Sequence, residues 1–230
     1  MKKLINKALV FLLVTAVNCF SNYAVAQNAA TSPNDNETQI RSFVQNIGDK
    51  IVRITGDKSL SKIQVENKMI NLVDSVIDPE WISRFVLGKY YKTIADEQKL
   101  RFKNLYREYM INTYGPKFQH YNVTKFTLLS SEDQNSFYLV RCEFMQKDLN
   151  SPVSVNFRVI NKNNKPAVID LVTEGVSLIE TQRSEFSSAI SQGGIDKFLS
   201  DLQQKVNNLR SHSYNNNAIQ TKPRKALVHK

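Results

Sequence analysis

The sequence predicts an α+β domain whose helices and strands are grouped rather than alternating. Three observations predict this class. Residues 40–113 carry apolar side chains at helical spacing, residues 123–173 alternate with the period of a strand, and a second helical pattern follows Glu174-Gly175. One face of the strands is apolar and the other is more polar, which is typical of an antiparallel sheet.

Two amphipathic helices are predicted at the start of this domain. The first is a single apolar stripe at spacings of three and four residues that ends near Gly56. The second begins near Ser59 and places its apolar residues on one face. The stripes consist of Ile40, Phe43, Val44, Ile47, Ile51 and Ile54 in the first helix, and of Ile63, Ile70, Val73 and Ile77 in the second.

Two further helices are predicted from their end signals. Asp78-Pro79-Glu80 provides an N-cap, a first-turn proline and an acid that favours the helix dipole, and this third helix ends near Gly88. Residues 93–96 resemble a capping box at the start of the fourth helix, which Gly115-Pro116 is predicted to end.

Four strands follow the fourth helix, and polar turns separate them. The third strand shows the pattern clearly, because Val153, Val155, Phe157 and Val159 alternate with polar residues. A strand then leads through Glu174-Gly175 into two amphipathic segments that Gly193-Gly194 separates. The four predicted strands are residues 123–130, 137–146, 152–160 and 167–173, with a turn at 161–165.

The two ends of the chain are predicted to lie outside this domain. Residues 1–26 combine early lysines, an apolar run of about ten residues and Ala24-Val25-Ala26, which is the pattern of a cleaved secretory signal. A retained anchor or a lipidated Cys19 is less favoured, because the run is short and Asn18 precedes the cysteine. Residues 27–35 are expected to be a linker, 36–210 the domain, and 211–230 a disordered basic tail.

Much of the positive charge lies at these two ends. The formal net charge of +10 falls to +7 without the signal, and to about +3 without the tail. No basic stripe on a folded face is indicated, so nucleic acid is not expected as a partner. The tail could touch an anionic membrane, although a solvated tail is favoured. Cys142 is the only cysteine after the signal and is expected to be a buried, inert thiol.

The sequence indicates no catalytic residue, metal site or cofactor. Gly175-Val176-Ser177 resembles a nucleophile elbow, but Ile179 stands where that motif requires glycine. No His, Cys and Asp set has the spacing of a zinc site. Asp170 and Glu174 lie on one face of a strand, and ion pairing or helix capping is favoured over acid–base catalysis. The histidines that follow the signal, His120, His212 and His229, do not form an evident triad with a nucleophile.

Three blocks of residues resemble one known family. They are Ile82 to Tyr91 (ISRFVLGKYY), then Glu97-Gln98 leading to Phe102, Tyr109 and Thr113-Tyr114, and finally Asp170 with Glu174-Gly175-Val176-Ser177, Arg183-Ser184, Phe186 and Gly193-Gly194-Ile195-Asp196. Over about residues 40–205 the chain resembles the MlaC family, also called the toluene-tolerance family, of periplasmic phospholipid carriers. It departs from the family pattern at Tyr91, where tryptophan is common, and at Gln182, where an aromatic residue is common.

The resemblance implies a helical shell on a curved four-stranded antiparallel sheet, with an apolar lipid cavity between them. It also implies three partners: phospholipid, an outer-membrane lipoprotein–porin complex, and an inner-membrane ABC transporter with a lipid-binding ring. Arg84 and Arg183 are candidates for head-group binding or for structural ion pairs. The wall of the cavity is predicted to consist of Trp81, Phe85, Phe102, Tyr106, Tyr109, Met110, Val140, Phe144, Val153, Val155, Phe157 and Val172.

The predicted function is therefore that of a periplasmic phospholipid carrier without enzymatic activity. A diacyl phospholipid carries about 30 methylenes, and at about 0.8 kcal/mol each their exposure to water would cost roughly 25 kcal/mol. Such a carrier must enclose both acyl chains and needs no catalyst. Two alternatives stay open at this point: an adaptor protein with a filled core, and, less favoured, a lipid hydrolase.

Overall fold

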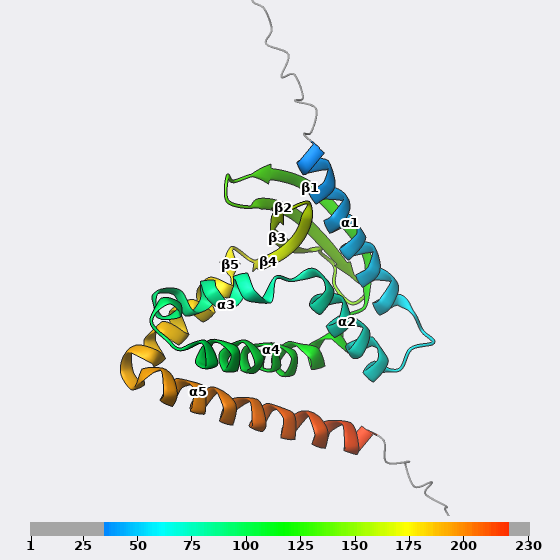
Figure 1. The fold of residues 1–230 in the computed structure, drawn as a ribbon. Coiled ribbons are helices and arrows are strands. Elements are labelled where there is room, and N and C mark those ends of the chain that lie inside the picture. Colours follow the sequence, from blue (N-terminus) through cyan, green and yellow to red (C-terminus); the bar gives the residue numbers. More distant parts are fainter. Residues whose placement is uncertain (1–34, 221–230) are drawn as a thin grey trace, which may run out of the picture. The chain divides into compact units, whose positions relative to one another are not determined.

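The computed structural model describes residues 35–220, with their side chains up to residue 211 (Figure 1). The predicted signal, most of the linker and residues 221–230 lie outside this part of the chain. Helices and strands are grouped as expected, so the predicted α+β class is confirmed. The elements are α1 (Asp35–Gly56), α2 (Lys62–Val76), α3 (Pro79–Leu87), η1 (Gly88–Lys92), α4 (Asp96–Phe118), β1 (Val123–Asp133), β2 (Tyr138–Gln146), β3 (Val153–Lys162), β4 (Lys165–Thr173), β5 (Val176–Ser177) and α5 (Leu178–Gln220).

The strands form one antiparallel sheet in the order β1-β2-β3-β4-β5. The four predicted strands are present, and the two-residue β5 adds a fifth at one edge. The turn between β3 and β4 places Asn163 and Asn164 at φ 53° and 58°. Two successive left-handed residues form the tight turn that suits the twist of a hairpin, and asparagine tolerates this conformation.

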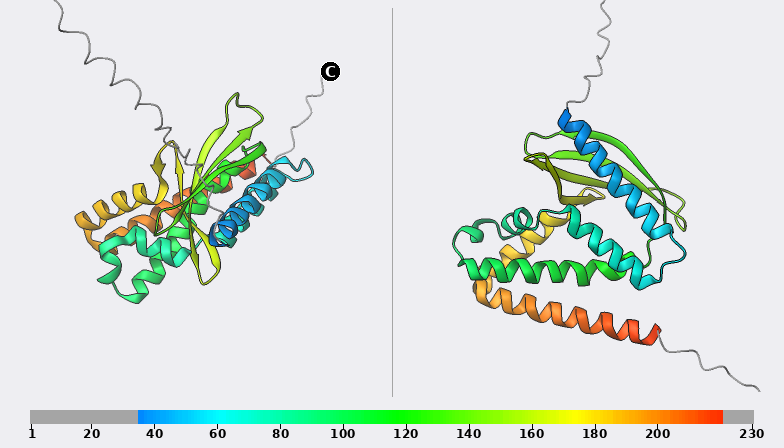
Figure 2. Two further views of the ribbon diagram at one scale, coloured as in Figure 1. Left: turned by 90° about the horizontal axis from the view of Figure 1, so that it is seen from above. Right: turned by 45° about the vertical axis from the view of Figure 1, so that its right-hand side comes forward.

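Helix α1 packs along one face of the sheet (Figures 1 and 2). Its apolar stripe buries Ile40, Val44 and Ile47 against side chains that alternate along β1, β2 and β3. Burial of this stripe, rather than intrinsic helix propensity, accounts for most of the helix's stability. We call this group the sheet cluster, and its buried members are Ile40, Val44, Ile47, Val123, Phe126, Val140, Cys142, Phe144, Phe157, Val159 and Val168.

A second apolar group lies between α3, α4 and α5, and α5 runs beside α4 (Figure 2). Phe102 is its centre: the side chain is fully buried and its ring contacts those of Tyr106, Phe186 and Phe198. We call this group the helical cluster. Its buried members are Ile82, Val86, Leu87, Ile94, Phe102, Leu105, Tyr106, Tyr109, Ile179, Phe186, Ile190, Phe198, Leu199, Leu202 and Val206.

The buried face of α2 differs from the prediction. Ser61 caps the helix as part of a capping box with Gln64. However, Ile63 and Val73, which were expected on the core face, are 44% and 37% exposed. The helix instead buries Val65, Met69 and Leu72, which form an alternative stripe at spacings of four and three. The sequence offers two apolar stripes on this helix, and contacts with α1 and α4 select between them.

The ends of α3, α4 and α5 also test the predicted boundaries. Asp78 accepts the backbone N–H of Trp81, and α3 ends at Gly88 as expected. Helix α4 begins after Ala95 and continues through Pro116 to Phe118, so its predicted end at Gly115-Pro116 was wrong. A proline in the final turn removes only one late hydrogen bond, which explains why the helix continues.

Helix α5 has the predicted interruption, because Gly194 adopts φ 77° and ψ 169° within it. The helix then extends to Gln220, into the segment 211–230 that was expected to be disordered from its start. Between Gly194 and Pro223 the sequence contains no glycine or proline. Once a helix is nucleated on a packed surface, each added residue costs little, which accounts for the extension.

Candidate functional site

The structure divides the predicted cavity wall between the two clusters. Its six helical residues all belong to the helical cluster, where they pack mainly on one another. Trp81 and Phe85 are half-buried and stacked, with ring centroids 5.2 Å apart. The others, Phe102, Tyr106, Tyr109 and Met110, line the α4 side of this cluster.

Most of the wall residues from the strands lie in the sheet cluster, on the face that α1 covers. Val140, Phe144 and Phe157 are buried there, and Val155 is half-buried at its margin. Val153 pairs with Phe144 across the strands and thus shares this face. Val172 does not, because a register shift between Arg158 and Val159 pairs Val172 with Asn156. Val172 therefore lies on the opposite face of the sheet.

The two clusters meet where α2 ends. Val76 packs in the sheet cluster, whereas the next residue, Ile77, packs in the helical cluster. The backbone of Ile77 also forms an isolated bridge with Val168 of β4. This junction was not found from the sequence, because helical periodicity assigns residues to a face of their own helix and not to one of two separate cores.

A buried carboxylate joins the start of α5 to the sheet. Asp170 of β4 accepts the Ser177 hydroxyl at 2.6 Å and the backbone N–H of Ile179 at 3.2 Å, and Arg158 lies 3.3 Å away. The Arg158 guanidinium also pairs with Glu180. Burial raises the pKa of the Asp170 carboxyl, although these donors oppose the shift. The network positions α5 on β4 and gives Asp170 a structural role, as expected, but its ion-pair partner is Arg158 and not Arg84 or Arg183.

A buried polar contact joins α4 to α5 within the helical cluster. Tyr106 donates its hydroxyl to the side-chain carbonyl of Gln182, and the Gln182 amide donates to the Met110 sulfur at 3.1 Å. Burial raises the pKa of the Tyr106 hydroxyl, which therefore stays protonated. Gln182, which departs from the family pattern, is thus accommodated by Tyr106 in an otherwise apolar contact.

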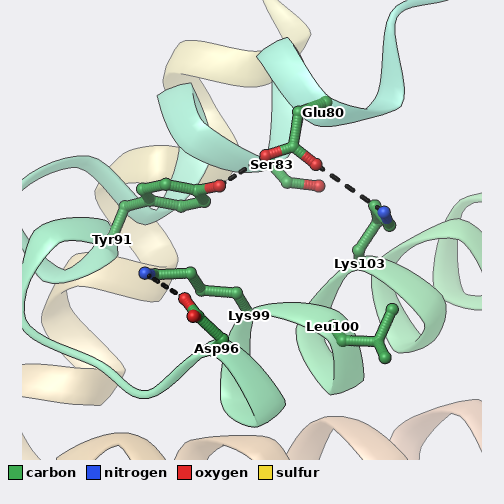
Figure 3. A pocket seen from close by; sticks show the side chains of 7 residues that line it. All are labelled: Glu80, Ser83, Tyr91, Asp96, Lys99, Leu100 and Lys103. Carbon is green, nitrogen blue, oxygen red and sulfur yellow. Dashed lines mark hydrogen bonds and ion pairs between the residues drawn. The ribbon is translucent and has the colours of Figure 1, made fainter.

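Two of the surface pockets among the described residues are lined mostly by polar side chains. One, of about 180 Å³, lies beside α3 and the start of α4 (Figure 3). In it Glu80 accepts the Tyr91 hydroxyl and faces Lys103 at 3.6 Å. The Tyr91 hydrogen bond is the main reason that the pKa of Glu80 is lowered. The other pocket, of about 310 Å³, is lined by Glu180, Arg183, Ser184 and Ser187. Neither is a deep apolar cavity of the kind that acyl chains require.

The two candidate head-group residues lie near each other on the surface. Arg84 is 3.9 Å from Glu80, and its guanidinium lies over the ring of Tyr91. Arg183 lies over the ring of Phe85 at 4.8 Å. Among the described residues, no carboxylate lies within ion-pairing distance of Arg183. Both side chains are exposed, so both are accessible to an anionic ligand.

The other candidate groups have structural environments. Ser177 caps α5 by accepting the backbone N–H of Glu180 while donating to Asp170. Cys142 is buried as predicted, and burial raises the pKa of its thiol to about 12. Within residues 35–211, His, Cys, Asp and Glu side chains form no group of three that could hold a metal ion. No helix in the described part of the chain is long and apolar enough to cross a membrane.

Comparisons with known proteins agree with this fold. A curated relative, the intermembrane phospholipid transport system binding protein MlaC of Haemophilus influenzae, is 26% identical over 180 residues, which cover 73% of this chain and 82% of the relative. A solved structure of a phospholipid-binding protein from Ralstonia solanacearum in complex with a phospholipid shares the fold, with a TM-score of 0.63. It is 20% identical, and the match covers 76% of this chain and 98% of that one. The family description "MlaC protein" matches residues 45–204, more than half of the sequence, and this chain belongs to the MlaC family.

Proposed function

We propose that this protein is a phospholipid carrier that moves lipid between two membranes without chemically changing it. The observation that carries the proposal is the family match over residues 45–204, which spans both apolar clusters. The names of the Haemophilus influenzae relative and the Ralstonia solanacearum structure both refer to phospholipid, and they support the same ligand class.

The arrangement of the two clusters suggests how acyl chains are enclosed. Each cluster is apolar, and the clusters adjoin at the end of α2, where the neighbouring residues Val76 and Ile77 pack in different clusters. We expect α2 to move away from β4 when a lipid enters, while the Asp170 network keeps the start of α5 on β4. The acyl chains then replace contacts between the clusters, and the half-buried Val155 and Phe85 lie at the margins that open. Each methylene removed from water contributes about 0.8 kcal/mol, which drives this exchange.

The place of action and the partners follow from the sequence and the family. The signal pattern of residues 1–26 supports export to the periplasm. A transport-system binding protein needs partners that load and unload it. We propose an outer-membrane lipoprotein–porin complex and an inner-membrane ABC transporter for these roles. Because a ligand moves towards higher affinity unless energy is supplied, any ATP dependence belongs to the transporter.

The proposal is tested by placing a charge in the expected wall. Val155→Glu introduces a carboxylate at the margin of the sheet cluster and should reduce co-purifying phospholipid severalfold, since an unpaired buried charge is strongly disfavoured. Val176→Glu is the matched control, because Val176 is 60% exposed. Lipid content is measured by mass spectrometry on protein whose circular dichroism shows that it is folded. Equal lipid content in the two variants would place the lipid elsewhere.

The close packing of the wall residues favours one alternative, an adaptor with a filled core. Phe102 is fully buried, and its ring contacts those of Tyr106, Phe186 and Phe198. Removal of lipid distinguishes the two functions. A carrier loses thermal stability when its ligand is stripped, because a ligand that binds only the folded state adds to stability. An adaptor keeps its full stability and does not take up lipid again.

A further inference from the structure

At the surface near the end of α3, three exposed cations lie over three aromatic rings. Arg84, Lys89 and Arg183 lie over the rings of Tyr91, Tyr90 and Phe85, at 5.3, 5.1 and 4.8 Å from the ring centroids. The rings are half-buried and the cations are exposed. We call this surface the α3–η1 patch, and it consists of Trp81, Arg84, Phe85, Lys89, Tyr90, Tyr91, Lys92 and Arg183.

The patch carries an excess of positive charge. Lys89, Lys92 and Arg183 have no carboxylate within 4 Å among the described residues, and Arg84 has only Glu80, at 3.9 Å. Glu80 is shared with Tyr91 and Lys103, so it does not neutralise the patch. The pocket of Figure 3 borders this surface on the α4 side. The carboxylate of Asp96 in that pocket forms an ion pair with Lys99 at 2.8 Å. The charge that faces solvent at the patch is therefore positive.

Cations also lie over rings elsewhere, as Lys117 does over Tyr114 and Lys205 over Tyr109, but these are single pairs, whereas three such pairs occur at the α3–η1 patch. Trp81 and Phe85 stack with an interplanar angle of 8°, and Arg183 lies over the ring of Phe85. Gly88 adopts φ 56°, and a Cβ there would lie 3.2 Å from the Arg183 guanidinium, so the arginine lies directly on the backbone turn. The cations are thus held next to the rings by the start of η1.

We infer that the α3–η1 patch docks on the surface of an anionic lipid bilayer. Tryptophan and tyrosine are enriched at the membrane–water interface, where lysine and arginine extend their charges towards lipid phosphates. An acidic protein surface is the other partner with complementary charge. Lysine is depleted at protein–protein interfaces, and two of the four cations here are lysines, which favours the membrane.

The inference concerns docking and not the enclosed ligand, so it can fail while the carrier function holds. A membrane-docking surface would bring the protein near the lipid that a membrane partner extracts or receives. Each basic residue near an anionic surface contributes about a fivefold factor in binding. Loss of two such residues should therefore weaken binding roughly 30-fold.

The test measures binding of the full exported chain to vesicles by flotation. Vesicles of phosphatidylglycerol and phosphatidylcholine are compared with vesicles of phosphatidylcholine alone, at low and at high salt. The variant is Lys89→Gln with Lys92→Gln, and Lys89→Arg with Lys92→Arg is the charge-preserving version. The matched control is Lys58→Gln with Lys62→Gln, which removes the same charge from exposed positions in the α1–α2 loop and at the first residue of α2. Segments outside the described residues are the same in all variants and cannot account for a difference.

We expect binding to the anionic vesicles that salt weakens, a roughly 30-fold loss in the Lys89/Lys92 glutamine variant, and near-normal binding in the arginine variant and the control. Equal losses in the patch variant and the control would overturn the inference in favour of net charge alone. Unchanged vesicle binding in the patch variant would also overturn it; if capture by a membrane protein complex were lost at the same time, the patch would be a protein-docking site. Mass spectrometry of bound phospholipid in each variant separates these outcomes from a failure of the carrier function.

Discussion

Gly48 of α1 packs directly against the Phe126 ring of the sheet, and its replacement by alanine tests how the sheet cluster is packed. A Cβ at this position would lie 2.1 to 2.4 Å from three atoms of the Phe126 ring. That ring is 9% exposed and lies 5.0 Å from the ring of Phe144, centroid to centroid. Phe144 in turn contacts Phe157. The ring therefore has no free space to enter, and α1 must shift away from the sheet.

Two opposing effects set the size of the change. Overpacking of a core costs about 1–3 kcal/mol, and the very short contact places Gly48→Ala near the upper end. Alanine also favours a helix over glycine by about 1 kcal/mol, which offsets part of this cost. We expect a net loss of about 2 kcal/mol in the free energy of unfolding. Gly56→Ala provides the matched control, because Gly56 ends the same helix with no atom within 4 Å of an added Cβ.

Urea unfolding of the two variants provides the assay. Gly56→Ala should be as stable as the wild type or up to about 1 kcal/mol more stable. Gly48→Ala should unfold at a lower urea concentration with an unchanged slope, since a change in midpoint alone reports stability. If both variants were equally stable, α1 could not lie on Phe126 as described, and the packing of the sheet cluster would need to be revised.

Four further predictions concern the side chains of Phe102, Asp170 and Cys142. Phe102→Ala should lower the free energy of unfolding by about 3–5 kcal/mol. The control Leu100→Ala, at a side chain that is 55% exposed, should change it by less than about 0.5 kcal/mol. Similar losses in the two variants would contradict the burial of Phe102 at the centre of the helical cluster. Asp170→Ala should cost about 3–5 kcal/mol because it leaves the buried Ser177 hydroxyl and the N–H of Ile179 without their acceptor and removes one of the two carboxylates that pair with Arg158. Asp170→Asn should cost less. Burial raises the pKa of Asp170 in the folded state, so protonation of this carboxyl stabilises the fold. This stabilisation is complete below about pH 4 and is lost as the pH rises through the pKa of the folded state. The free energy of unfolding of the wild type relative to Asp170→Asn, measured in urea, should therefore fall as the pH rises, and a rise in this difference would refute the argument. The Cys142 thiol, with its pKa raised to about 12, should react with a thiol reagent only when the chain unfolds, and rapid labelling of the folded protein would show that it is accessible.

Much of the fold could be predicted from the sequence because its local signals agree with its final packing. The alternation in β3 and the asparagines at its turn define a hairpin within a short stretch of chain. Asp78 and Pro79 likewise mark the start of α3 by chemistry that acts within one helical turn. Signals of this kind need no knowledge of distant residues.

The features that were missed depend on contacts between distant segments. Helix α2 carries two apolar stripes, and only its neighbours decide that Met69 rather than Val73 is buried. The register shift after Arg158 turns Val172 to the face opposite Val155, and strand alternation alone does not reveal such a shift. The structure shows that most of the predicted wall residues pack in two separate clusters, and their role as the wall of a lipid cavity stays a prediction.

The central claim, that this protein carries an intact phospholipid, is tested most directly by what it retains on purification. The exported chain is purified without detergent, and its bound lipid is extracted and identified by mass spectrometry. The account predicts nearly one intact phospholipid for each protein molecule, and the acyl chains of that lipid report how many the interior encloses. A folded, stable protein that contains no lipid and takes up none from vesicles would contradict the claim and support the adaptor, and lysolipid alone would indicate hydrolysis.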